Sequence, residues 1–182
     1  MTQKSETLLW KRIQSKIPPH WNTTRIENRH GGGVPDVHIC AEGIPFWVEL
    51  KVTKANAINI SSHQVAWNYA YCMSGGVSFF LVHPLSSPHL YLFGGVYGRE
   101  LLKSGLRGVD LGSGLGIRPL WSGDNESGLV VGLLEAARGL PMSHLQSRGH
   151  RSESGSSRHH RSWSGRESGS EVPRPPWPGP GV

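Results

Sequence analysis

Residues 45–52, PFWVELKV, show the clearest alternation of apolar and polar side chains in the chain. Successive side chains of a strand point to opposite faces, so Phe46, Val48, Leu50 and Val52 share one face of this segment. The other face carries a tryptophan, a glutamate and a lysine, each two residues apart. The surrounding apolar residues predict a central strand, where two ionisable side chains are unusual.

The neighbouring segments predict the rest of the fold. Residues 35–40, PDVHIC, alternate in the same way, and a short turn at Glu42-Gly43 joins them to 45–52. Helical spacing, capping residues and apolar runs predict helices over 5–17 and 61–74, strands over 23–28 and 77–83, and an edge strand over 90–95. The order is helix, three strands, helix, strand, strand. We therefore expect a small α/β fold in which helices flank a mixed sheet.

Composition divides the chain into three parts. Residues 1–97 contain all of these elements and are predicted to form the core domain. Residues 98–143 are predicted to be an extension in which a long glycine-rich loop, 104–127, separates two helical patches. Residues 144–182 are rich in Ser, Gly, Arg, His and Pro. Such a segment buries too little apolar surface to offset its chain entropy, so we expect a disordered basic tail.

Charge and residue usage exclude several classes of protein. The net charge of +6 and the isoelectric point near 9.7 permit a polyanionic partner. Two cysteines cannot build a disulfide framework, and neither C-x-x-C nor H-E-x-x-H occurs, so structural zinc is not expected. No apolar run reaches the roughly 18 residues of a membrane span, and the N-terminus has no apolar leader. We expect a cytoplasmic protein.

Pairing of the strands at 35–40 and 45–52 predicts a cluster of ionisable side chains. Asp36 begins the first strand, and Glu49 and Lys51 share a face of the second, so pairing brings the three together. Two buried carboxylates repel each other and are costly to ionise, and a divalent cation removes both problems. Oxygen ligands suit Mg²⁺, for which Mn²⁺ can substitute. We predict a metal site formed by Asp36, Glu49 and the backbone carbonyl of Leu50.

Lys51 would face the water bound to that metal. Its ammonium can orient the water, assist its deprotonation or stabilise charge on an attacked phosphate. Metal, water and cation together are typical of phosphodiester hydrolysis. The simpler interpretation is that Glu49 and Lys51 form the solvated face of an amphipathic strand. The upstream glycines of GGGVPD, 31–36, favour the site because they let backbone approach a ligand closely.

The segments GGGVPDVHI, 31–39, and FWVELKVTK, 46–54, together resemble the PD-(D/E)XK nuclease superfamily. Asp36, Glu49 and Lys51 occupy its motif positions, and its restriction-endonuclease-like core has the same αβββαβ order. The chain is most similar to the branch of Holliday junction resolvases and virus-type replication-repair nucleases (VRR-NUC), which includes small phage-encoded enzymes. The resemblance implies a Mg²⁺-dependent DNA endonuclease of phage replication, recombination or repair, in a bacterial or phage-infected cell.

The same resemblance implies two further site residues and an assembly. The branch has a glutamate on the first helix that adds to the metal site; Glu6 matches it by element and position, and Glu27 competes. The branch also has a glutamine on the helix after the E-x-K strand. Gln64 matches it, although a surface residue in a first helical turn is the simpler interpretation. Resolvases act as dimers because a junction needs two symmetric cuts, so a homodimer on duplex or branched DNA is implied.

Three cationic side chains near the motif are candidates for contacts with the phosphate backbone. Lys54 lies just past the E-x-K strand, and Arg25 and Arg29 flank the glycine-rich turn. Such contacts would make binding sensitive to salt. A nucleic-acid-binding protein that keeps the fold without catalysis is the alternative function. The intact set of aspartate, glutamate and lysine favours the enzyme.

Overall fold

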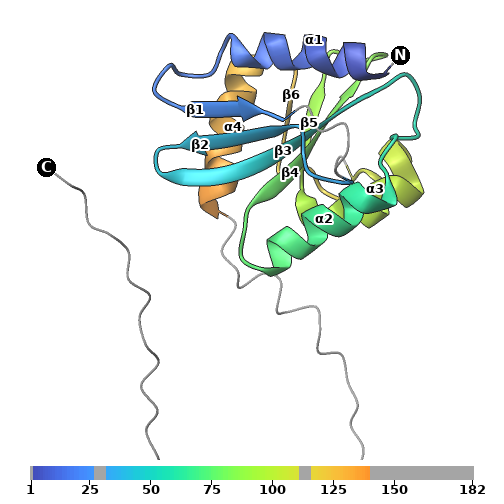
Figure 1. The fold of residues 1–182 in the computed structure, drawn as a ribbon. Coiled ribbons are helices and arrows are strands. Elements are labelled where there is room, and N and C mark those ends of the chain that lie inside the picture. The colour runs from blue at the N-terminus through green and yellow to red at the C-terminus, as the bar shows by residue number, and fades with distance from the viewer. Residues whose placement is uncertain (1, 27–31, 111–115, 140–182) are drawn as a thin grey trace, which may run out of the picture. The chain divides into compact units, whose positions relative to one another are not determined.

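The structure is a computed structural model that describes residues 2–26, 32–110 and 116–139 (Figure 1). Its elements, in chain order, are α1 (Thr2–Gln14), β1 (Asn22–Arg25), β2 (Val37–Ala41), β3 (Ile44–Thr53), α2 (Ser62–Met73), β4 (Ser78–Pro84), β5 (Leu90–Gly94), the 3₁₀ turn η1 (Gly95–Tyr97), α3 (Gly98–Ser104), the 3₁₀ turn η2 (Gly105–Gly108), β6 (Trp121–Gly123) and α4 (Glu126–Gly139). None of the helices described is both long and apolar enough to cross a membrane. The expected 144–182 tail and the residues Glu27 and Arg29 lie outside the described residues.

The strands form one sheet in the order in which they occur in the chain. β3 and β4 run parallel, with α2 as the crossover between them, and the other neighbouring pairs are antiparallel. A parallel pair needs such a crossover because a short turn can only reverse the chain direction. The predicted α/β class, the αβββαβ order and the mixed sheet flanked by helices are confirmed.

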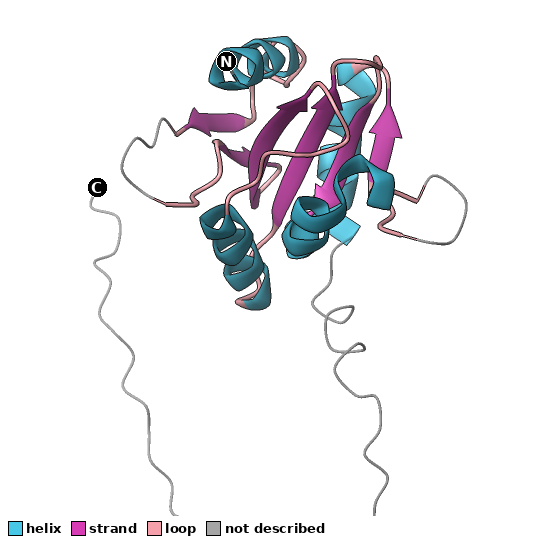
Figure 2. Cartoon of the chain, turned by 90° about the vertical axis from the view of Figure 1, so that its right-hand side faces the viewer, coloured by secondary structure: helices cyan, strands magenta, loops and turns pink. Residues whose placement is uncertain are grey.

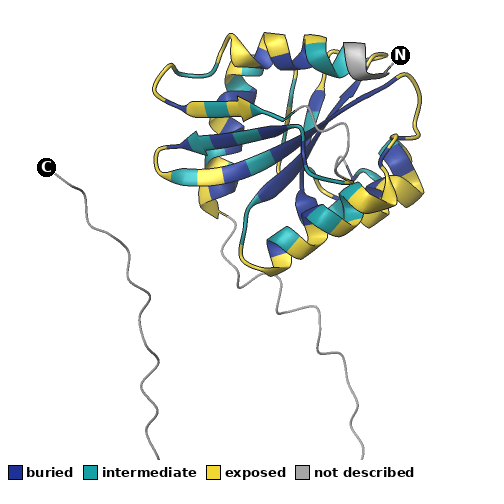
Figure 3. Cartoon of the chain, viewed as in Figure 1, coloured by how far each residue is buried: buried dark blue, intermediate teal, exposed yellow. Residues whose placement is uncertain are grey.

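Helices cover both faces of this sheet. α1 and α4 lie on one face, and α2 and α3 lie on the other (Figures 1 and 2). The central strands β3 and β4 are buried while the outer helix surfaces are exposed (Figure 3). Side chains alternate accordingly: Phe79 and Leu81 of β4 pack in the core under α1 and α4, and Phe80 and Val82 pack in the core under α3.

The structure differs from the predicted elements at two places. The first helix spans Thr2–Gln14 instead of 5–17; beyond it, the amide of Lys16 bonds to the carbonyl of Ile13, and Pro18 disfavours helical backbone at the preceding residue. The strand predicted at the sheet edge, β5, is covered by β6, which pairs Leu92 with Trp121. The expected 104–127 loop therefore contains a strand. At three residues, β6 is too short to show a period of two.

Packing of the extension on the core leads to a test of the predicted domain boundaries. Leu129 and Leu133 of α4 are fully buried in the same core as α1. We expect a chain ending at residue 143 to unfold cooperatively in a thermal melt followed by circular dichroism, and a chain ending at 97 to lack that transition. A cooperative 97-residue chain would show that the extension is a separate appendage.

Candidate active site

Strand pairing brings the motif residues together at the start of β2. The last antiparallel pair of β2 and β3 joins Val37 to Val48, and both face the core under α1. Glu49 follows Val48 on β3 and by alternation turns away from that core, while Asp36 directly precedes Val37 and lies at the edge of β3. The charge of Asp36 acts directly on Glu49. The two acids predicted from the sequence are therefore neighbours.

Beyond Val48, β3 has an open edge because β2 starts only at Val37. A carboxylate takes the place of the missing strand there. Asp36 Oδ2 accepts a hydrogen bond from the amide of Leu50 at 2.8 Å, and the amide of Val52 lowers the pKa of Glu6. We call Glu6, Asp36 and Glu49 the acidic cluster. The N–H and C=O of a strand residue point to the same edge, so the Leu50 carbonyl also faces this cluster.

The two carboxylate oxygens of Glu49 have different surroundings. Oε1 accepts hydrogen bonds from Lys51 Nζ, at 2.9 Å, and from Gln64 Nε2. Oε2 is buried and has no hydrogen-bond donor. The residue is only 1% exposed, so this oxygen is shielded from bulk water. An orphaned buried carboxylate oxygen is costly, and a cation bound to it would remove that cost.

Gln64 is aimed at Glu49 by the cap of α2. Ser61 is the N-cap: its hydroxyl accepts from the amide of Gln64 at 3.2 Å, and Gln64 Oε1 accepts from the amide of Ser61 at 3.0 Å. The S-x-x-Q spacing of this capping box is visible in the sequence. Because Oε1 is used in the cap, the Nε2 donors are left for the glutamate. Ser61 thus positions a site residue, a role that the sequence reasoning did not assign.

The glycine-rich turn closes the site on the side of α2. Gly33 has φ of +95°, and a Cβ built there would lie 2.3 Å from the backbone oxygen of His63 and 3.0 Å from the amide of Gln64. Only glycine allows this approach. The turn that leads to Asp36 therefore packs on the first turn of the helix that carries Gln64.

For the nuclease activity that the motif resemblance implies, Gly33→Ala is expected to lower the rate of cleavage by about a hundredfold, because small displacements of reacting groups are that costly. Gly43→Ala is the matched control: Gly43 also has positive φ, +82°, but no atom lies within 4 Å of the added methyl group. Both variants bear the strain of positive φ, and Gly33→Ala should lose more stability because its methyl group also meets the backbone of His63. Comparable cleavage by the two variants would contradict the role of the turn.

Burial raises the pKa of all three acids. For Glu49, burial and the charge of Asp36 outweigh Lys51 and raise the pKa to about 8. Burial also raises the pKa of Asp36, although the hydrogen bond from the Leu50 amide lowers it in part. Burial likewise raises the pKa of Glu6, although the charge of Lys51 lowers it in part. The 2.9 Å contact of Glu49 with Lys51 alone would favour the ionised form, but one ammonium does not compensate three acids.

This donor set fits a hard divalent cation. No three His, Cys, Asp or Glu side chains within 2–26, 32–110 and 116–139 form a ready-made metal cluster. Mg²⁺ does not need one, since it commonly takes one or two carboxylates and keeps several waters. Asp36, Glu49 and the carbonyl of Leu50 supply oxygen ligands only, and Glu6 lies within electrostatic range of Asp36.

The predicted phosphate-binding residues lie in different environments. Lys54 is exposed just beyond β3. Arg25 is half-buried: its Nη2 donates to Thr7 Oγ1 at 3.3 Å, its Nη1 is buried without a partner, and its charge lowers the pKa of both Asp36 and Glu6. Arg25 is therefore placed to balance the acids, a position that differs from the surface contact expected of it.

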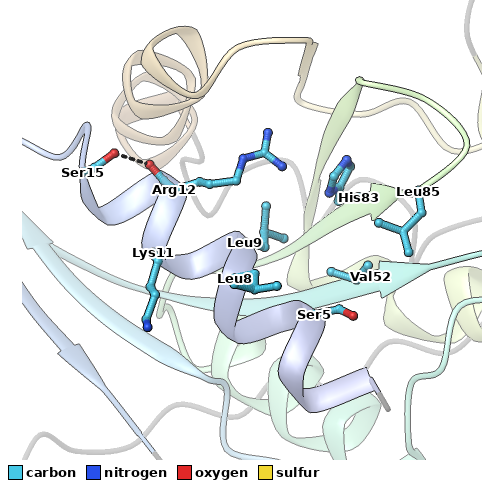
Figure 4. Close-up of a pocket in the computed structure, with 9 residues that line it drawn as sticks. All are labelled: Ser5, Leu8, Leu9, Lys11, Arg12, Ser15, Val52, His83 and Leu85. Atoms are coloured by element: carbon cyan, nitrogen blue, oxygen red, sulfur yellow. Dashed lines mark hydrogen bonds between the residues drawn. The ribbon is translucent and has the colours of Figure 1, made fainter.

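A hollow of about 600 Å³ lies beside α1, on the other face of the sheet (Figure 4). Leu9, Val52 and Leu85 line it together with Arg12 and His83. Val52 shares its face of β3 with the core under α1, whereas Glu49 and Lys51 turn away from that core. This hollow is therefore separate from the acidic cluster.

No model of a known protein family and no curated protein matches the sequence. Among solved structures, the chain is similar to Hjc, a Holliday junction resolvase from Archaeoglobus fulgidus, with a TM-score of 0.36 and 14% sequence identity. The match covers 51% of this chain and 73% of the resolvase. A similarity at this level does not assign an activity.

Proposed function

We propose that this protein is a metal-dependent nuclease that hydrolyses phosphodiester bonds in DNA. The observation that carries the proposal is the buried Glu49 Oε2, an acceptor without a donor, on a carboxylate that adjoins Asp36 and Lys51. If the ion pair of Glu49 and Lys51 served only to stabilise the fold, the unpaired Oε2 would be a cost without a benefit. Apolar residues of similar volume would avoid that cost.

In this proposal Asp36, Glu49 and the Leu50 carbonyl would hold Mg²⁺ or Mn²⁺, with Glu6 adding negative charge beside them. The bound metal would supply an activated water and neutralise charge on the attacked phosphate. The Leu50 amide holds the carboxylate of Asp36. Gln64 and Lys51 fix the rotamer of Glu49 through its other oxygen, so that Oε2 stays available.

Besides fixing the rotamer of Glu49, Lys51 supplies a positive charge to the proposed site. Its side chain is 8% exposed and its ammonium is held by Glu49, so it is a fixed positive charge beside the proposed metal ligands. There it would orient the attacking water and stabilise negative charge that develops on the phosphate. Lys54, which is exposed three residues further along the chain, would contact a neighbouring phosphate.

The substrate we propose is branched DNA, such as a four-way junction, in the replication, recombination or repair of a phage, with a homodimer making the paired cuts. The test compares cleavage of a junction, a flap, a single strand, a linear duplex and a supercoiled plasmid across a Mg²⁺ titration, with Mn²⁺ and EDTA arms. Metal-dependent cutting of any of them supports a nuclease, and preference for the junction supports the substrate. Binding without cutting in every arm would instead indicate a protein that keeps this fold for binding alone.

A further inference from the structure

A row of four aromatic rings extends from the candidate active site across the sheet face that α2 covers. Ring centroids are 4.8 Å apart for His38 and Trp47, 5.5 Å for Trp47 and Trp67, and 4.9 Å for Trp67 and Tyr71. The last two rings are nearly parallel, at 15°. We call these four residues the aromatic row.

The row begins on the same elements as the candidate active site. His38 lies two residues after the motif aspartate on the β2 segment, and Trp47 lies two residues before the motif glutamate on β3. Strand residues two apart share a face. Trp67 lies three residues after Gln64 on α2, and helical residues at that spacing are neighbours. The row therefore continues the catalytic surface in one direction.

These rings do not belong to the interior. Neither of the two hydrophobic cores includes any of the four, and each of them is half-buried. At the far end, Tyr71 lines a hollow of about 480 Å³ together with Pro45 and Val77. The Tyr71 ring packs over Gly76, where a Cβ would lie 2.2 Å from it. The row is thus a partly open aromatic surface that ends in a hollow.

We propose that the aromatic row binds unpaired bases of the nucleic-acid strand that is cut at the candidate site. This inference rests on the proposed function. Stacking of bases on aromatic side chains is tolerant of sequence, because every base has a π-face. No lysine or arginine belongs to the row, so it would recognise bases rather than phosphates. In a duplex the base faces are already stacked, so the row would favour unpaired over paired nucleic acid.

The dimensions fit a short stretch of strand. Four residues of β3 separate Glu49 from Pro45, and at about 3.3 Å per residue this is about 13 Å. Nucleotides along one stacked strand are about 3.4 Å apart, so the row spans a few nucleotides beside the bond that is cut. The substrate class that follows is DNA with unpaired bases next to the cleavage point.

The test measures binding with the full chain in EDTA, where metal-dependent cleavage does not interfere. The probes are a fluorescein-labelled single strand of about 15 nucleotides that contains 2-aminopurine, and the blunt duplex of the same sequence. Wild-type protein should bind the single strand more tightly and quench its 2-aminopurine fluorescence. Trp67→Leu should weaken single-strand binding about tenfold and leave duplex binding unchanged.

Two further variants separate stacking from folding. Tyr69→Leu changes an aromatic residue of the same helix that is 51% exposed and outside the row, and it should bind like wild type. Trp67→Tyr keeps an aromatic ring and should restore most of the single-strand affinity. If Trp67→Leu fails to melt cooperatively, Trp47→Leu replaces it in the same comparison.

Equal losses for single strand and duplex, or an equal effect of Tyr69→Leu, would overturn the aromatic row as a base-binding surface. Failure of the proposed function looks different. In that case no metal supports cleavage of any substrate, while single-strand preference still depends on Trp67. If cleavage is metal-dependent but the preference for single-stranded DNA is the same in Trp67→Leu as in wild type, the proposed nuclease function stands and the role of the aromatic row is contradicted.

Discussion

Glu49→Gln is expected to reduce cleavage to background and, in the same protein, to flatten the loss of stability that the wild type shows as pH rises from about 5 to 9. Glutamine keeps an acceptor for the Nε2 donor of Gln64 but cannot provide the second anionic oxygen that a Mg²⁺ ligand needs. The pH effect is independent of catalysis and is measured in EDTA.

The sign of the pH effect follows from the raised pKa. The folded protein keeps a proton on Glu49 up to about pH 8, whereas the unfolded chain releases it near the ordinary value of 4.5. Between these values the folded state binds more protons, so the free energy of unfolding falls as pH rises, and the loss is complete above about pH 8. Its size is of the order of a few kcal/mol, since one unit of pKa is worth about 1.4 kcal/mol.

Thermal melts of the two proteins at several pH values in EDTA provide the measurement. Glu135→Gln is the matched control, because Glu135 is an exposed glutamate of α4. It should melt with the wild-type pH dependence and cleave at the wild-type rate. Identical pH profiles for Glu49→Gln and wild type would show that this carboxyl ionises normally in the folded protein, and the metal proposal would lose its main support.

The second large effect is expected at Asp36, where two substitutions should separate catalysis from stability. Asp36→Asn and Asp36→Ala should both reduce cleavage to background, because each removes the anionic ligand. The alanine variant also leaves the amide of Leu50 without its acceptor, at a cost of about 1–3 kcal/mol, whereas the asparagine variant retains a side-chain oxygen for it.

The two effects are read separately, by metal titration of cleavage and by denaturant unfolding in EDTA. Asp36→Asn should be at least as stable as wild type, since it removes a buried carboxyl that repels Glu49. An asparagine variant that cleaves at a near wild-type rate would contradict the site. Equal stability of the two variants would show that the Leu50 amide finds another acceptor.

The sequence predicted the centre of the site better than its surroundings. The alternation in 45–52 determines the face on which Glu49 and Lys51 lie, and the short turn before it determines which residue pairs with Val48. Both follow from local geometry. Gln64 was reached through the family resemblance, although the capping box that aims it at Glu49 is itself a local pattern.

What the sequence did not reveal depends on contacts between distant segments. Glu6 was named only through the family resemblance, because its place near Asp36 depends on the packing of α1 on β3, which no local spacing encodes. Arg25 was expected at the surface because arginine usually lies there, but its guanidinium lies beside the acids. The covering of β5 by β6 was missed because three residues carry no periodic signal.

The shared use of Gln64 links folding to chemistry. Its amide oxygen closes the first turn of α2 while its amide nitrogen holds Glu49, so the same side chain ends in a helix terminus and in the acidic cluster. Helix termini fray more readily than helix centres. Each fraying event at Ser61 would release Glu49. Hydrogen exchange of the amides in the first turn of α2 should therefore report how often the proposed metal site is disassembled.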